Sequence, residues 1–283
     1  MRMSFAKLLI FTFVACFWHT KAWSAEDDWS SENFLPRFEV SLYRDIPLVV
    51  GSAAISLYGN YRASQMDKPL GDEIRPESRL LPWDKPIAGR YDENAARASQ
   101  YAAVLGAMPL VLGGISIARE EATWGEFGAF TLMFAEALAI QNGINMLARS
   151  LEVWPRPYIY GKSGDAHREA EDADAEAYGS FFSGHASAAF MVATFTSEWF
   201  STIYPNSPYK SLVWTSTMSL AGFVGVLRIA AGRHYPTDVA AGALVGTGVS
   251  LAVIRAHKKP LRIGGNQISF WAVPNSVGTV VSF

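Results

Sequence analysis

The chain has 283 residues, of which 50% are hydrophobic and 18% are charged, and it carries a formal net charge of -2. This composition is more apolar than that of a usual soluble domain, yet the mean hydropathy of +0.11 is modest for a protein with many membrane spans. The charge balance, without a basic stripe or interleaved aromatic and basic residues, argues against a nucleic-acid partner.

The N-terminus has the pattern of a secretory signal peptide. Residues 1–7 form a short basic segment, residues 8–18 are apolar, and residues 22–24 offer small side chains at the positions that a signal peptidase reads. We therefore expect a signal peptide over residues 1–24, with an uncleaved anchor as the alternative. The only cysteine, Cys16, lies in this segment, so a cleaved chain would contain no disulfide.

Residues 25–100 are expected to form an N-terminal extension and surface segment. Within it, Ile46–Tyr58 is an apolar stretch that is short for a membrane span and favours a packed or interfacial helix. Arg62–Gln100 is rich in proline and in charges of both signs. This composition fits a cap near a functional site and also fits a plain linker.

The segment 101–262 carries the apolar runs of a helical bundle. Tyr101–Ala118 and Phe127–Ala148 are each long enough to span a membrane. The second run contains polar residues that would have to face the bundle interior, namely Glu136, Gln141, Asn142 and Asn145. Three further helices are predicted over Ala186–Tyr204, Ser211–Leu227 and Val239–Ile254. In the last of these, Gly242 and Gly246 permit close helix contact.

Between these helices, Lys162–Gly179 is predicted to be a solvated acidic loop, because its spacing matches no EF-hand pattern. A basic cluster follows the last apolar run and includes Arg255, His257, Lys258, Lys259 and Arg262. The sequence therefore predicts an all-α, membrane-embedded bundle of about five to six core helices. Residues 263–283 are expected to add a short irregular or strand-like tail.

The stretch 224–242 places Arg228, His234 and Asp238 between two long apolar runs. Gly232 can end the first helix, and Pro236 suits the first turn of the next. His234 would then precede a helix N-terminus, which favours an anion, and Asp238 can reach back to the imidazole. A surface pair of Arg228 and Asp238 with a capping histidine is the alternative for this stretch alone.

Two further stretches favour phosphate chemistry. Arg149 and Arg156 stand seven residues apart at the end of an apolar helix, and Ser183, Gly184 and His185 precede another apolar run. Guanidinium groups bind phosphate oxygens bidentately, and backbone N–H groups at a glycine-containing helix start can approach the remaining oxygens. The three stretches together supply three arginines, two histidines and one aspartate, which are the groups that a metal-free phosphotransfer site requires.

Together the three stretches resemble the signature of the type 2 phosphatidic acid phosphatase superfamily, which includes bacterial class A acid phosphatases and vanadium haloperoxidases. The matching positions are Arg156-Pro157, Ser183-Gly184-His185, Arg228, His234 and Asp238. The chain departs from the pattern at Arg149, where the family usually has lysine, at Phe182, where it has proline, and at Leu227, where it has serine.

The resemblance implies a double displacement without a metal or other cofactor. His234 would attack phosphorus, Asp238 would hold its ring, and His185 would protonate the leaving oxygen and then activate water. The remaining residues would neutralise the phosphoryl oxygens; they are Arg149, Arg156, Arg228, Ser183 and Gly184.

A site flanked by apolar helices meets lipid headgroups first, so the expected substrate is phosphatidic acid, phosphatidylglycerophosphate, an isoprenyl pyrophosphate or the phosphates of lipid A. The positive-inside rule places the basic cluster in the cytoplasm and the site on the periplasmic face of a bacterial inner membrane. The alternatives are a soluble periplasmic acid phosphatase of broad specificity, a vanadium haloperoxidase, and a non-catalytic membrane binding protein that retains the motif.

Overall fold

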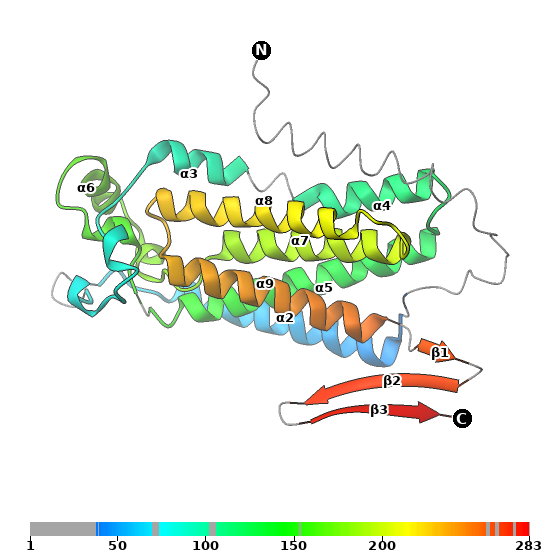
Figure 1. Ribbon diagram of the computed structural model, residues 1–283. Helices are drawn as coiled ribbons and strands as arrows, with labels where there is room; N and C mark the ends of the chain where they lie inside the picture. Colours follow the sequence, from blue (N-terminus) through cyan, green and yellow to red (C-terminus); the bar gives the residue numbers. More distant parts are fainter. Residues whose placement is uncertain are drawn as a thin grey trace, which may run out of the picture.

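The computed structural model describes residues 38, 40–69, 74–101, 106–152, 154–258, 261–263, 266–273 and 276–282, so the expected signal peptide lies outside the described residues. The described part is a helical bundle, as predicted (Figure 1). Its α-helices are α2 (Leu42–Ser64), α3 (Glu93–Gln100), α4 (Met108–Ala118), α5 (Trp124–Arg149), α6 (Gly164–Glu171), α7 (Gly184–Ile203), α8 (Lys210–Ala230) and α9 (Pro236–His257).

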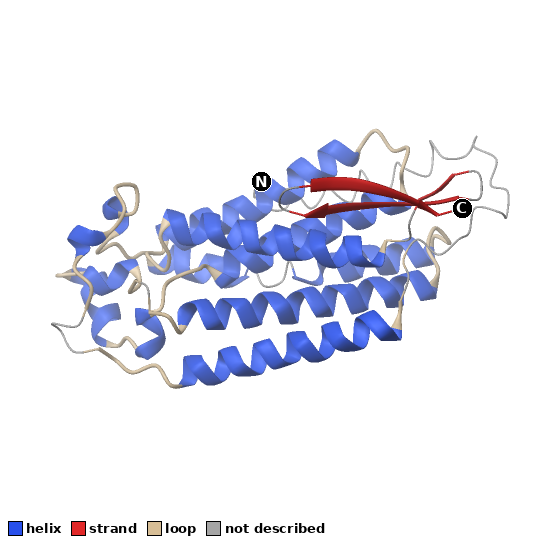
Figure 2. Cartoon of the chain, turned by 90° about the horizontal axis from the view of Figure 1, so that it is seen from below, coloured by secondary structure: helices blue, strands red, loops and turns tan. Residues whose placement is uncertain are grey.

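The long helices lie side by side along one direction (Figure 2). α2 packs against α5, and α7 packs against both α8 and α9. α5 and α8 end at the same end of the bundle at which α7 and α9 begin (Figure 1). α6 lies at this end too, with the short 3₁₀ helices η3 (Glu77–Arg79), η4 (Lys85–Ile87), η6 (Pro157–Tyr160) and η7 (Ala175–Tyr178). The predicted motif residues are therefore brought to one end of the bundle.

The turn between α8 and α9 forms as the sequence predicts. Gly232 has a φ of 63°, a left-handed conformation that glycine adopts without steric cost. A Cβ at this position would lie 1.8 Å from the carbonyl oxygen of Arg90. Pro236 then occupies the first turn of α9, where a missing N–H leaves no hydrogen bond unmade. The reversal places His234 directly before the N-terminus of α9.

The predicted close contact of the glycines on α9 is made with α7. A Cβ on Gly242 would lie 2.6 Å from the carbonyl oxygen of Ser183, and a Cβ on Gly246 would lie 2.1 Å from that of Ser187. Backbone cannot yield as a flexible side chain does, so both positions require glycine. This contact fixes the start of α7 against α9.

Replacement of Gly246 by alanine is therefore expected to destabilise the bundle by at least ~3 kcal/mol, because the new methyl group meets backbone. Gly248→Ala is the matched control on the same helix, since nothing lies within 4 Å of its Cβ position. The control should be neutral or slightly stabilising, by up to about 1 kcal/mol. Thermal unfolding in detergent checks both, and equal melting temperatures would contradict the close contact.

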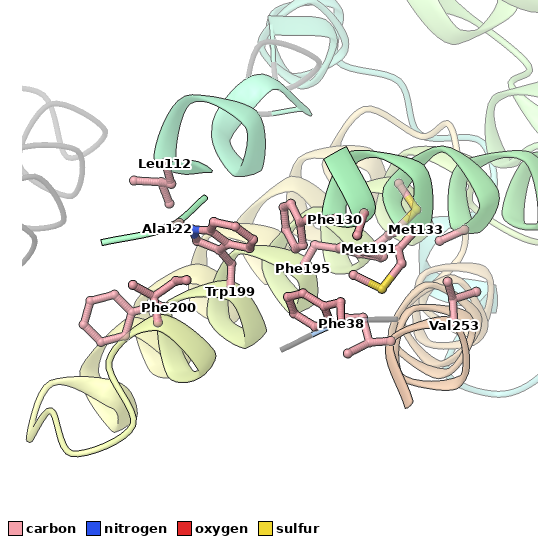
Figure 3. Packing of buried hydrophobic residues seen from close by; sticks show 14 of the residues in the cluster. Phe38, Leu112, Ala122, Phe130, Met133, Met191, Phe195, Trp199, Phe200 and Val253 are labelled. Carbon is pink, nitrogen blue, oxygen red and sulfur yellow. The ribbon is translucent and has the colours of Figure 1, made fainter. Parts of the chain in front are cut away.

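An aromatic core packs between the helices of the bundle (Figure 3). Trp199 of α7 stacks on Phe38 with ring centroids 6.3 Å apart and lies 4.4 Å from the ring of Phe130. Its indole N–H donates to Ser116 Oγ at 3.1 Å, so the one polar atom of this buried ring is satisfied. The core anchors α4, α5 and α7 to one another.

Three helices, α5, α8 and α9, are long and apolar enough to cross a membrane. Large apolar side chains stand exposed on the outer faces of the bundle, including Leu57, Val226 and Leu244. By contrast, Glu136, Gln141 and Asn145 of α5 are buried in the interior, as predicted. Asn142 donates to Ser56 Oγ of α2 at 2.9 Å and so pairs two helices. An apolar exterior together with polar residues in the interior is typical of a membrane protein.

The structure differs from the sequence-based prediction in the extent of several elements. α2 covers 23 residues, because it continues through polar residues at both ends of the apolar stretch 46–58. α4 covers only 11 residues of the run 101–118. The acidic loop 162–179 contains α6 and η7 and is not irregular throughout. The run 101–118 is long enough to span a membrane, but α4 itself is too short to cross a bilayer.

The tail is strand-like. β1 (Leu261–Ile263), β2 (Asn266–Val273) and β3 (Ser276–Ser282) form an antiparallel sheet in the order β1-β2-β3, with Phe270 paired to Thr279. His257, which the sequence places in the basic cluster, has a fully buried side chain. Lys258 is exposed, and its ammonium group pairs with Glu198 at 2.6 Å.

Candidate active site

A cavity of about 850 Å³ lies between α5, α7 and α8, beside the turn that precedes α9. The predicted site residues that line it are Arg149, Arg156, Gly184, His185, Arg228 and His234. Asp238 and Ser183 do not line the cavity; both are buried behind it. Residues separated by up to 85 positions in the sequence are therefore gathered around one space.

The three arginines present unused donors. In the described part of the chain, the Nε atoms of Arg149, Arg156 and Arg228 are buried and have no hydrogen-bond partner. Buried guanidinium donors without partners are costly unless a ligand satisfies them. Three such groups around one cavity form a receptor for a multiply charged anion with several oxygens, such as phosphate.

Arg228 is held by a residue outside the three motifs. Its Nη1 donates to Ser99 Oγ at 2.9 Å, and Ser99 lies at the end of α3 and is fully buried. The neighbouring position, Leu227, lacks the serine that the family pattern has there. Ser99 thus supplies a hydroxyl from a different part of the chain, and it orients the guanidinium of Arg228.

His234 is buried and its ring is fixed through one nitrogen. Nδ1 lies 3.0 Å from the carbonyl oxygen of Ser180 and 3.5 Å from Oδ2 of Asp238. A carbonyl oxygen can only accept, so Nδ1 carries the proton and Nε2 is the ring nitrogen left for chemistry. The shorter contact shows that Ser180 orients the ring directly, while Asp238 contributes from a longer distance.

Asp238 is tied to the same serine. Its Oδ2 accepts from Ser180 Oγ at 2.6 Å and from the backbone N–H of Tyr235 at 2.9 Å. Ser180 therefore links the carboxylate and the imidazole, with its hydroxyl bonded to Asp238 and its carbonyl oxygen to His234. Sequence reasoning missed Ser180, although it stands only three residues before Ser183 in the same motif stretch.

The start of α7 is shaped by backbone contacts. Ser183 Oγ accepts from the N–H of Ala186 at 3.3 Å and caps the helix, and the N–H of Ser183 donates to the carbonyl oxygen of Asp238 at 3.0 Å. Asn145 donates to the carbonyl oxygen of Phe182 at 2.7 Å, and a Cβ on Gly184 would lie 2.8 Å from Asn145 Oδ1. These contacts leave His185 exposed toward the cavity.

The segment between α2 and α3 caps this end of the bundle. Asp84 is buried and accepts from the N–H of Thr237 at 3.2 Å and from its hydroxyl. The N–H of Gly89 donates to the carbonyl oxygen of Pro157 at 2.8 Å. These bonds join the segment to the start of α9 and to the arginine motif. Of the two interpretations that the sequence left open, a cap near the site is confirmed for the described residues.

The environment of His234 favours its neutral form. Burial, and after it the guanidinium groups of Arg228 and Arg156, hold the pKa of His234 well below 6.5. A nucleophilic nitrogen must be unprotonated, so a lowered pKa keeps His234 available at mildly acidic pH.

The same shift predicts a pH dependence of stability. Below pH ~6.5 a histidine in the unfolded chain binds a proton, whereas His234 in the folded protein binds one only at a lower pH. The free energy of unfolding that His234 contributes is therefore lost as the pH falls below ~6.5. The expected loss is at most about 1.4 kcal/mol per pH unit in that window. Melting temperatures from about pH 7 to about pH 5 should show a shallower decline for His234→Asn than for the wild type. Parallel declines would contradict the shift.

Glu176 partly occupies the anion site. Its Oε2 accepts from Arg149 Nη2 at 2.6 Å, and the residue lines the cavity. This hydrogen bond and the charge of Arg149 lower the pKa of Glu176, so the carboxylate is ionised at neutral pH. A bound phosphate would compete with this carboxylate for Arg149.

Glu176→Gln is therefore expected to tighten inhibition by inorganic phosphate, by up to roughly five-fold for so exposed a pair. Glu171→Gln, in the same acidic segment but paired with His167, is the control and should leave inhibition unchanged. Inhibition constants from initial rates check this prediction. Weaker inhibition of Glu176→Gln would show that the carboxylate helps to position Arg149.

The sequence model of the PAP2 superfamily matches residues 130–262, a range that contains every motif residue. Among solved structures, the chain is similar to a transmembrane PAP2 type phosphatidylglycerolphosphate phosphatase from Bacillus subtilis, with 17% identity and a TM-score of 0.38 over 75% of this chain and 94% of that chain. No curated protein matches. Residues 130–262 thus match the PAP2 superfamily model, and this match supports a phosphatase activity.

Proposed function

We propose that the protein is a metal-independent phosphatase that hydrolyses membrane lipid phosphates through a phosphohistidine on His234. The observation that carries the proposal is the set of three buried, partnerless Nε atoms of Arg149, Arg156 and Arg228 around a cavity that also holds two histidines. The arginines supply the positive charge that a phosphoryl group requires in the transition state. No metal ion takes part in the proposed chemistry.

The proposed reaction has two displacements. Nε2 of His234 attacks phosphorus, the N–P bond forms, and the P–O bond to the lipid breaks while His185 gives its proton to the leaving oxygen. His185 then takes a proton from water, the hydroxide attacks phosphorus, and the N–P bond breaks to release inorganic phosphate. Ser180 and Asp238 hold the proton on Nδ1 throughout. The three arginines neutralise the phosphoryl oxygens in both steps.

The shape of the cavity supports a lipid substrate. Besides the charged residues and the polar Gln141, Asn142 and Asn145 of α5, its wall contains small or apolar side chains of α5, α7 and α8: Ala135, Leu138, Ala139, Ala188, Ala189, Val192 and Val224. The cavity also reaches Ser56 on α2, so it extends along the bundle and away from the charged end. A headgroup phosphate at the arginines would leave room for apolar substrate atoms along this wall.

We also propose that the site faces the periplasm and that the chain resides in a bacterial inner membrane. Arg255 and Lys258 lie at the end of α9 opposite the cavity, and the positive-inside rule favours the cytoplasm for that end. Within this proposal, residues 101–262 form the phosphatase bundle, residues 25–100 add the packed helix α2 and the cap, residues 263–283 form the tail, and residues 1–24 are a signal peptide.

The experiment is phosphate release by the detergent-purified protein in excess EDTA. Phosphatidic acid, phosphatidylglycerophosphate, an isoprenyl pyrophosphate, lipid A and a small soluble ester are compared side by side, with His234→Ala as the control. We expect turnover of at least one lipid that disappears in the variant. Turnover of the soluble ester alone would instead indicate a broad-specificity acid phosphatase, and halide oxidation with vanadate would indicate a haloperoxidase. Turnover that survives the substitution would refute the proposed mechanism.

A further inference from the structure

A second group of ionisable side chains lies far from the cavity. Asp45 of α2, Glu136 of α5 and His257 of α9 each place one potential ligand atom within 4.8 Å of the others. His257 lies about 29 Å further along the axis of α9 than Asp238. None of the three residues lines the cavity, so the cluster has no part in the phosphate chemistry.

Three polar side-chain atoms of this cluster, on Glu136 and His257, lack hydrogen-bond partners. Both carboxylate oxygens of Glu136 and Nε2 of His257 are buried without a hydrogen bond to any described residue. The side chain of Glu136 is 1% exposed and that of His257 is 0% exposed. Nδ1 of His257 lies 2.9 Å from the carbonyl oxygen of Val253, so the proton sits on Nδ1 and the lone pair of Nε2 points at the two carboxylates. A cation between the unprotonated Nε2 and the two carboxylates would satisfy all three groups.

The spacing fits a shared metal ion. Nε2 of His257 lies 3.2 Å from Oδ1 of Asp45 and 3.5 Å from Oε2 of Glu136. Nitrogen and oxygen ligands about 2.0–2.1 Å from a tetrahedral Zn²⁺ stand about 3.3 Å from each other. The second carboxylate oxygen of Glu136 also has no hydrogen-bond partner and is available as a fourth ligand atom for the metal ion.

The surroundings hold the ligands in place. Oδ2 of Asp45 accepts from the N–H of Ser41 at 2.7 Å, and Oδ1 accepts from Nε of Arg44 at 2.6 Å. The bond from Nδ1 of His257 to a backbone carbonyl is the outer contact that metal-bound histidines usually make. Both ligands are thus oriented before any ion binds.

We propose that Asp45, Glu136 and His257 form a structural site for a divalent transition metal ion of the Zn²⁺ kind. One imidazole with two carboxylates is a mixed nitrogen and oxygen ligand set that suits Zn²⁺. The ion would join α2, α5 and α9 at the end of the bundle opposite the cavity. It stabilises the fold and does not touch the substrate.

The test uses the full-length chain in detergent. The protein is stripped with EDTA, incubated with Zn²⁺ and separated from free ion, and its metal content is measured by plasma mass spectrometry. We expect one Zn²⁺ per wild-type chain, a loss of at least ten-fold in His257→Gln, and wild-type content in His167→Gln, which changes an exposed histidine. His234→Ala should also bind as the wild type does, so the result is separate from the test of the phosphatase.

A second measurement covers the case in which His257→Gln does not fold. Zn²⁺ should raise the melting temperature of the stripped wild type, because an ion that binds only the folded state stabilises it. Glu136→Gln, which keeps the volume of the side chain, should weaken this response. No stoichiometric Zn²⁺ and no rise in melting temperature in the wild type would overturn the proposal, and the cluster would then be an ion pair with a protonated imidazole.

Discussion

His234→Ala is expected to lower turnover on the order of 10⁴-fold or more, the largest effect of any single substitution in the site. Removing the nucleophile abolishes the covalent route, and the arginines can only position a substrate for which no attacking nitrogen remains. The residual rate would come from binding and charge stabilisation alone. Initial rates with the preferred lipid, at saturating and at low concentration, measure the loss in kcat and in kcat/KM.

The control for this substitution is His167→Ala, which removes an exposed histidine of α6 and should leave the rate unchanged. A melting temperature close to that of the wild type must accompany the loss, since His234 is buried beside Ser180 and Asp238. A folded His234→Ala protein that retains more than about a tenth of wild-type kcat would exclude a phosphohistidine mechanism.

Arg228→Ala is expected to cost on the order of 10²- to 10³-fold in kcat/KM. Arg228 is 5% exposed, its guanidinium is fixed by Ser99, and its buried Nε has no partner among the described residues. A preorganised donor aimed at developing phosphoryl charge is worth about this much in other enzymes. Ser99→Ala should lower the rate to a smaller extent, because it loosens the orientation of the guanidinium and keeps its charge.

Arg149→Lys provides the contrast within the same cavity. Arg149 already forms an ion pair with the exposed Glu176. Lysine stands at this position in the family pattern, so we expect this substitution to be tolerated. Rates measured side by side for the two arginine variants test the ranking. An effect of Arg149→Lys as large as that of Arg228→Ala would show that the planar guanidinium of Arg149 is specifically required.

Much of the fold and of the cavity lining follows from local sequence patterns. The turn from α8 to α9 depends on Gly232 and Pro236, whose conformational preferences act within a few residues. Long apolar runs predict α5, α7, α8 and α9 to within a few residues of their observed ends. The family resemblance then supplied the residues that the structure gathers at one end of the bundle.

Contacts between distant parts of the chain could not be predicted in this way. Ser99 reaches Arg228 across 129 positions, and Glu176 reaches Arg149 from a segment that composition describes only as acidic. His257 follows an apolar run beside lysines and arginines, so the sequence placed it in the basic cluster. Only the packing of α9 against α2 and α5 brings it between Asp45 and Glu136, and no spacing rule for metal ligands connects residues so far apart.

The most direct test of the central claim is to trap the phosphorylated enzyme. The His185→Ala variant is mixed with an aryl phosphate, whose leaving group needs no proton, and is quenched with alkali, which preserves phosphohistidine. Since His185 also activates water, the variant should accumulate one phosphoryl group per chain, and peptide mass spectrometry should locate it on His234. A phosphoryl group on another residue, or none on His234 while the aryl phosphate is consumed, would contradict the proposed mechanism.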